Sequence, residues 1–210
     1  TAHPAAQVGR ANYVLALSAD HGVAPMPVPP RGGRIATDDV RERIEDTLRT
    51  AWGPLQKGSY VDAVNFTDVY FAHGIFDKLH ANPTLMASMT KSIEEIPGVL
   101  RVLRTDQLSD SSRDPMVRRA ALSYDSGRSG DLMVVPKEYW FMSPRAVIGT
   151  THGSPYEYDT HVPVIFFGGA VKSGRSKASV TPADIAPTLA DLVGMKLPMA
   201  EGRALLDGDR

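Results

Sequence analysis

The stretch Ala11 to Gly22, ANYVLALSADHG, decides the fold class of this chain. Its first part, Asn12 to Ala19, is a short apolar run with β-branched and aromatic members, which is typical of a buried strand. Asp20, His21 and Gly22 follow at once. Because α/β sheets place their chemistry at the ends of strands, the Asp-His pair is expected at the edge of a sheet. Gly22 permits a sharp turn through which the two adjacent side chains can converge.

The composition is that of a folded protein without a nucleic-acid surface. The chain has 210 residues, 42% of them hydrophobic, which is enough for a sizeable core. Its formal net charge is −1, with acids and bases mixed, so there is no broad basic face for duplex nucleic acid. The sequence has no run of about 18 apolar residues, so no membrane span is predicted. It has no cysteine, which excludes disulfides, thiolate metal ligands and a cysteine nucleophile within these residues.

The first residues do not resemble a natural N-terminus. The chain starts with Thr1 rather than Met and runs almost directly into the apolar strand. We therefore expect a fragment of a longer polypeptide, whose targeting signals would precede these residues.

An α+β insert is predicted between the opening strand and the second half of the chain. Residues 23–33 are too rich in proline and glycine for a helix or a central strand, so they are expected to form a loop near the site. The patterns that follow predict a helix over 38–52, two antiparallel strands over 60–64 and 69–72, a helix over 82–96 and a strand over 99–103. Residues 38–108 are thus expected to form a compact insert that covers the site.

The remaining segments, 1–37 and 109–210, are expected to form one α/β domain. A helix is predicted after Asp114, strands over 131–135 and 162–167, and a last helix after Thr181. Because strands and helices alternate along the chain, the predicted fold class is α/β, with a mostly parallel sheet flanked by helices.

A second candidate site segment surrounds His152, which lies between Thr151 and Gly153. Carboxylate and imidazole ligands together suit Zn²⁺ or Mn²⁺. Each signal is weak when taken alone. An Asp-His pair is most often a turn or a surface dipeptide, and a single loop histidine is most often a hydrogen-bonded one.

Two longer motifs make the interpretation more specific. Residues 18–22, SADHG, and residues 149–168, GTTHGSPYEYDTHVPVIFFG, resemble the alkaline phosphatase superfamily. The resemblance is to its phosphate monoesterases with a threonine nucleophile and to the related nucleotide pyrophosphatase/phosphodiesterases. Residues 128–131, RSGD, and 181–189, TPADIAPTL, also resemble that branch. The resemblance covers essentially the whole chain.

The resemblance implies a two-metal hydrolase of phosphate esters, located in the periplasm or secreted. It implies that Asp20 and His21 bind one zinc ion and that His152 binds the other. Asp159 and His161 are candidates for orienting His152, since a metal-bound imidazole usually donates its other N–H to an acceptor. A purely structural role at the start of the following strand is the alternative for both.

The resemblance also implies that the nucleophile and the other metal ligands lie upstream of this chain. No catalytic residue is therefore assigned within it. We expect the chain to correspond to the C-terminal part of the enzyme, to be inactive by itself, and to have the rest of the parent polypeptide as its partner.

Two alternatives remain open at this point. The parent protein could be a phosphodiesterase or a sulfatase of the same superfamily, which the nucleophile would decide. The chain could also be a binding or assembly module without catalysis. The presence of Asp20, His21 and His152 argues against that module, because it would not need clustered metal ligands.

Overall fold

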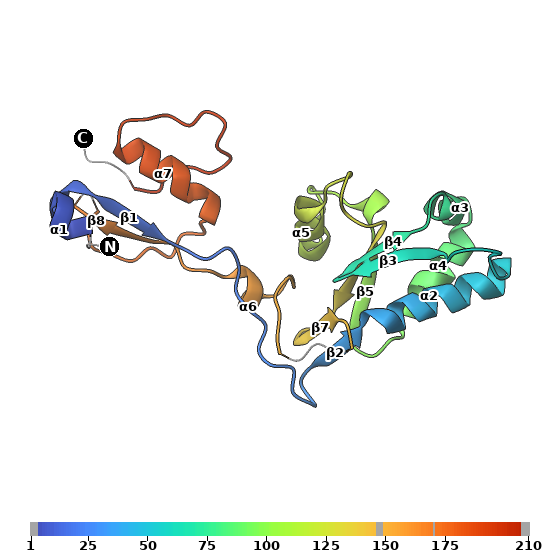
Figure 1. Ribbon diagram of the computed structural model, residues 1–210. Helices are drawn as coiled ribbons and strands as arrows, with labels where there is room; N and C mark the ends of the chain where they lie inside the picture. Colours follow the sequence, from blue (N-terminus) through green and yellow to red (C-terminus); the bar gives the residue numbers. More distant parts are fainter. Residues whose placement is uncertain (1–3, 146–148, 170, 207–210) are drawn as a thin grey trace. The chain divides into compact units, whose positions relative to one another are not determined.

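The computed structural model describes residues 4–145, 149–169 and 171–206. The chain divides into two compact units, each described by itself. Unit 1 comprises residues 1–22 and 160–210, and unit 2 comprises residues 23–159. Figure 1 shows the elements of both units along the chain.

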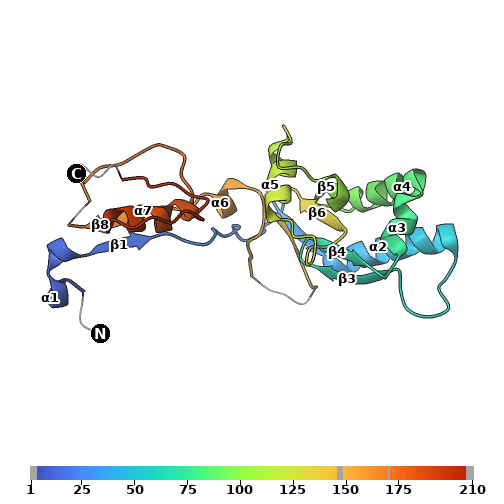
Figure 2. The same ribbon diagram turned by 90° about the horizontal axis from the view of Figure 1, so that it is seen from above.

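Unit 1 is built around a pair of antiparallel strands. β1 (Val14–Leu17) pairs with β8 (Ile165–Gly168), with Leu15 opposite Phe167 and Leu17 opposite Ile165. These four apolar side chains therefore share one face of the pair, and in unit 1 they are exposed. The helices of this unit are α1 (Pro4–Val8), a 3₁₀ turn (Arg10–Asn12), a second 3₁₀ turn (Pro182–Asp184) and α7 (Ile185–Leu192), which runs beside the strands (Figure 2).

Unit 2 contains most of the chain and two further sheets. Its elements, in chain order, are β2 (Gly33–Ala36), α2 (Thr37–Trp52), β3 (Val61–Asn65), β4 (Asp68–Phe71), α3 (Ile75–His80), α4 (Pro83–Glu94), β5 (Val99–Arg104), a 3₁₀ turn (Thr105–Gln107), α5 (Pro115–Ser123), β6 (Leu132–Pro136) and β7 (Trp140–Ser143). The short α6 (Glu157–Thr160) lies at its end. Four strands form an antiparallel sheet in the order β3-β4-β6-β5, and β2 pairs in parallel with β7.

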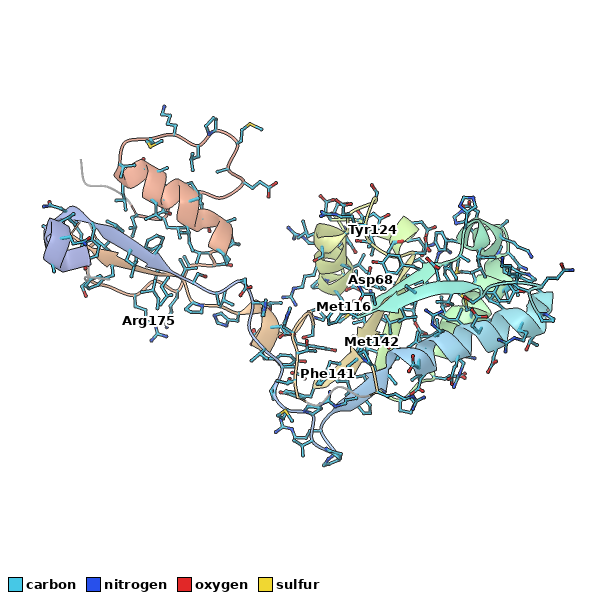
Figure 3. All side chains as sticks on the ribbon, in the orientation of Figure 1. Asp68, Met116, Tyr124, Phe141, Met142 and Arg175 are labelled. Carbon is cyan, nitrogen blue, oxygen red and sulfur yellow. The ribbon has the colours of Figure 1, made fainter. Side chains whose placement is uncertain are left out.

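The core of unit 2 lies between this sheet and two helices. α2 buries Val40, Ile44 and Leu48 completely, one helical turn apart, as the apolar pattern predicts. They pack with residues of α4 and with one face of the sheet, where Val134 lies. On the opposite face, α5 packs through Ala120 against Leu103 and Val135. Figure 3 shows Met116 of α5, which packs against that second cluster. The sheet is thus covered on both faces.

The predicted helices and strands of residues 38–104 are confirmed, but the prediction of a mostly parallel sheet is wrong. Among the described residues, only β2 and β7 pair in parallel. β3 and β4 are joined by a two-residue turn at Phe66 and Thr67, and such a short connection forces neighbouring strands to be antiparallel. The class is therefore α/β with small, mostly antiparallel sheets. No helix of the described residues is long and apolar enough to cross a membrane.

The predicted loop over 23–33 extends to Gly32, and the chain enters β2 at Gly33. The predicted insert over 38–108 falls inside unit 2, and its role as a cover for the site stays a prediction.

Candidate functional site

Asp20 and His21 converge at a turn just after β1. The backbone amide of His21 donates to Asp20 Oδ1 at 3.1 Å, and the imidazole Nδ1 lies 2.6 Å from the carbonyl oxygen of Gly22. Because a carbonyl only accepts hydrogen bonds, Nδ1 carries the proton in this arrangement. Nε2 is then the ring nitrogen that faces Asp20 Oδ2, which is 3.5 Å away. The turn therefore brings together two electron-pair donors.

This pair fits two neighbouring ligands of one metal ion. When Nε2 carries no proton, it and the carboxylate oxygen both offer lone pairs, so a metal cation between them stabilises the arrangement. On a tetrahedral zinc with bonds of about 2.0–2.1 Å, two ligand atoms stand roughly 3.3 Å apart. The Asp20 side chain is 88% exposed and that of His21 39%, so an ion can reach both. No group of three or more His, Asp or Glu side chains suited to a metal occurs among the described residues.

The segment that carries His152 lies in unit 2 and is bound there to the residues that follow Gly22. Ala24 donates its backbone amide to the carbonyl of Thr151 at 3.0 Å, and Thr150 donates its hydroxyl to the carbonyl of Ala24. Val23 donates its amide to the carbonyl of Tyr158 at 3.1 Å. His152 itself is exposed. The His152 loop, residues 149–154, is thereby held against the start of unit 2.

Asp159 binds the backbone of the His152 loop. Its side chain is only 3% exposed, and Oδ2 accepts the amide of Ser154 at 2.7 Å. Its other oxygen, Oδ1, is buried and has no hydrogen-bond partner in the described structure. His161 is exposed in unit 1. The predicted roles of Asp159 and His161 in orienting the His152 ring stay predictions.

Arg34 anchors the His152 loop, and no sequence pattern predicts this contact. Its guanidinium donates to the carbonyl of Gly149, the first residue of the His152 loop, and lies 4.6 Å from the ring centroid of Phe141. Figure 3 labels Phe141 on β7, the strand that pairs with β2 of Arg34. The sequence offered no signal for this contact, since an arginine on a short strand is usually a solvated side chain.

Three tyrosines form a cluster around the end of the same loop. The rings of Tyr139 and Tyr158 stack at 5.5 Å, and Tyr156 lies 5.7 Å from Tyr158. The Tyr156 hydroxyl donates to the carbonyl of Pro136, and burial raises the pKa of this phenol. Tyr158 accepts the amide of Tyr139 on its hydroxyl at 3.1 Å. These contacts join α6 and the residue before it to Pro136, at the end of β6, and to Tyr139, just before β7.

Unit 1 has a cavity of about 1720 Å³ beside β8. The strand and the segments 171–176 and 203–206 line it, and its charged lining residues are Lys172, Arg175 and Arg203. His161 also lines it, whereas Asp20 and His21 do not. The cavity is therefore separate from the candidate metal ligands of this unit.

The chain is similar to known proteins over most of its length. No family model matches the chain. It is 32% identical over 199 residues to alkaline phosphatase PafA of Elizabethkingia meningoseptica. The alignment covers 91% of this chain and 36% of that protein. It is 30% identical over 201 residues to a Myroides odoratus protein named calcium-transporting ATPase, and this alignment also covers 91% of this chain and 36% of that protein. The chain thus spans little more than a third of the length of these relatives.

Two solved structures are similar to this chain in fold. The crystal structure of wild-type alkaline phosphatase PafA matches with a TM-score of 0.76 and 27% identity, over 96% of this chain and 39% of that chain. Human ectonucleotide pyrophosphatase/phosphodiesterase 5 matches with a TM-score of 0.60 over 92% of this chain and 44% of that chain. At 17% identity, the second likeness concerns the fold alone.

Proposed function

We infer that the chain, which matches part of the fold of alkaline phosphatase PafA, belongs to the alkaline phosphatase superfamily, and from this premise we propose that it supplies metal ligands to a two-metal phosphate-ester hydrolase. Asp20 and His21 are the proposed ligands of one zinc ion, and His152 is a proposed ligand of the other. Manganese is an alternative metal for the same donors. The proposed substrate is a small phosphate ester, and the proposed location is the periplasm or the exterior of the cell.

One observation supports this proposal most directly. The residues that follow the Asp-His pair, Val23 and Ala24, are hydrogen bonded to the segment that carries His152. Within unit 2, the chain directly after the Asp-His pair is thus held to the loop that carries His152. The fit of the Asp20 and His21 donor atoms to one metal ion is independent support.

In such a centre, bound zinc would activate the nucleophile and stabilise the leaving oxygen. The residues of this chain hold and orient the ligands. The bond from His21 Nδ1 to Gly22 fixes the tautomer that presents Nε2. Arg34 and Asp159 hold the two ends of the His152 loop. Thr150 uses its hydroxyl on Ala24, so we do not assign it as the nucleophile. The nucleophile and the remaining ligands are proposed to lie in the part of the relatives that this chain does not match.

Zinc titration of the chain tests the proposal. We expect weak zinc binding that is lost when Asp20 or His21 is replaced by alanine, and a second weak site that is lost in His152→Ala. His73→Ala is the matched control, because His73 is exposed and lies outside the proposed site. Tight binding that all three substitutions leave unchanged would mean that other residues hold the metal.

The activity itself is tested on the parent polypeptide. We expect it to hydrolyse a chromogenic phosphate monoester, with loss of turnover in His21→Ala and His152→Ala and normal turnover in His73→Ala. The chain alone is expected to be inactive. Full activity of the His152→Ala parent enzyme would contradict the proposed role of that residue.

A further inference from the structure

Asp159 is a buried carboxylate of unit 2 that uses only one of its two oxygens. Oδ2 accepts the Ser154 amide at 2.7 Å, while the buried Oδ1 has no hydrogen-bond partner among the described residues. Leaving an acceptor position of a buried carboxylate empty is unfavourable. A partner for Oδ1 is therefore expected in the functional state of the protein.

The neighbourhood of Oδ1 is the His152 loop. Ser154, whose amide binds the same carboxylate, is two residues after His152. Ser154 Oγ accepts the amide of Tyr156 at 3.4 Å, and Tyr156 accepts the amide of Asp159 on its carbonyl at 3.0 Å. These bonds close the turn between the loop and α6. They hold the carboxylate beside the segment that presents His152.

Building on the proposed function, we propose that Asp159 is a positioning residue that accepts the ring N–H of His152 on Oδ1. A histidine that binds a metal through one ring nitrogen usually donates its other N–H to a carboxylate or carbonyl, which fixes its tautomer and raises its basicity as a ligand. Asp159 offers a buried oxygen for that role. The bond would determine which nitrogen of His152 faces the metal.

Asp159 could instead serve only to brace the loop through Ser154, and two substitutions separate these roles. Asp159→Asn keeps one carbonyl oxygen for the Ser154 amide but puts an NH₂ group, which cannot accept, in place of the other oxygen. Asp159→Ala removes both acceptors. Glu157→Gln is the matched control, since Glu157 is an exposed carboxylate of the same helix.

The experiment uses the isotope-labelled chain in NMR and zinc as the probe. Hydrogen exchange of the Ser154 amide reports the loop, and the ring ¹⁵N shifts of His152 report its tautomer with and without zinc. In the wild type and in Glu157→Gln we expect one dominant tautomer. In Asp159→Asn we expect mixed tautomers, unchanged protection of the Ser154 amide, and zinc affinity at His152 lowered by about 10–100-fold. In Asp159→Ala the Ser154 amide should also lose its protection.

Mixed tautomers of His152 in the wild type would overturn the inference without any variant. Wild-type tautomer and zinc affinity in Asp159→Asn, with changes confined to Asp159→Ala, would also overturn it and leave Asp159 as a brace of the loop. If zinc never moves the His152 ring signals but the tautomer still depends on Asp159, the positioning role stands and the proposed metal function fails.

Discussion

Ala24 is hydrogen bonded through its carbonyl to Thr150 and through its amide to Thr151. Thr150 donates its hydroxyl to the carbonyl of Ala24, and the amide of Ala24 donates to the carbonyl of the next residue, Thr151, at 3.0 Å. Ala24 is only 3% exposed, so these groups are not simply exchanged for water. These two bonds link the segment after the Asp-His pair to the one that carries His152.

Replacing Thr150 by valine should loosen this link while keeping the shape of the side chain. The variant leaves the carbonyl of Ala24 without its hydroxyl partner, at a cost of about 1 kcal/mol. Hydrogen exchange of the Ala24 amide should become faster, while amides in the core of α2 should not change. Thr90→Val is the control, because the Thr90 hydroxyl donates to the carbonyl of Ala87 within its own helix, α4. Equal effects of the two variants on the Ala24 amide would show that the Thr150 bond is not what holds the segment.

Asp184 should make the folding of unit 1 depend on pH. Its carboxylate accepts the amides of Arg203 and Thr181, both at 2.8 Å, and these bonds, that of Arg203 foremost, lower its pKa. Because the folded-state pKa is below the unfolded one, this stabilisation is complete at neutral pH. It is lost as the pH falls from the ordinary aspartate pKa through the lower folded value.

Hydrogen exchange of the Arg203 amide, measured at a series of pH values, checks this prediction. In the wild type, its protection should fall in acid more than that of amides in the core of α2. Asp184→Asn keeps one carbonyl oxygen that can accept the Arg203 amide but has no carboxyl group to titrate, so its protection should lose this acid dependence. Glu201→Gln, an exposed carboxylate in the same tail, should behave as the wild type. An unchanged acid profile in Asp184→Asn would assign the pH dependence to another group.

The local elements could be predicted from the sequence because their signals are local. The apolar spacing of Val40, Ile44 and Leu48 predicts α2, and all three side chains are buried. Asn82 before Pro83 predicts the start of α4, and there the Asn82 side chain accepts the amide of Leu85. In both cases neighbours in the sequence determine the result.

The partners of strands could not be predicted in this way. β1 pairs with β8, and β2 with β7, although the partners lie far apart in the sequence. The alternation of helices and strands favours a parallel sheet in general. It does not determine which distant strands pair in this chain or in which direction. The contact of Arg34 with Gly149 is equally non-local, and the buried oxygen of Asp159 depends on the closed turn around it. Such features follow from the assembled fold rather than from a local pattern.

Removing the side chain of Ile44 should destabilise unit 2 strongly. Ile44 is completely buried between α2, α4 and the sheet, so Ile44→Ala should lower the free energy of unfolding by about 2–5 kcal/mol. Both tryptophans of the chain, Trp52 and Trp140, lie in unit 2, so urea unfolding followed by tryptophan fluorescence reports this unit. Leu122→Ala is the control, since Leu122 is 70% exposed and its loss should change the free energy by less than about 0.5 kcal/mol. A similar midpoint for both variants would mean that Ile44 is not part of the core.

Position 98 requires glycine for two reasons, which are its positive φ and the Trp140 ring that lies against it. Its φ is +94°, and a Cβ atom added there would overlap the Trp140 ring. Gly58 has a similar φ of +84° but open space around it. Gly58→Ala should therefore cost only the backbone strain, about 1–2 kcal/mol, whereas Gly98→Ala adds displacement of Trp140. We expect Gly98→Ala to be the less stable variant in urea and to shift the emission of Trp140 to longer wavelength, with no such shift in Gly58→Ala. Equal stability and identical emission spectra would show that the Trp140 ring does not rest on Gly98.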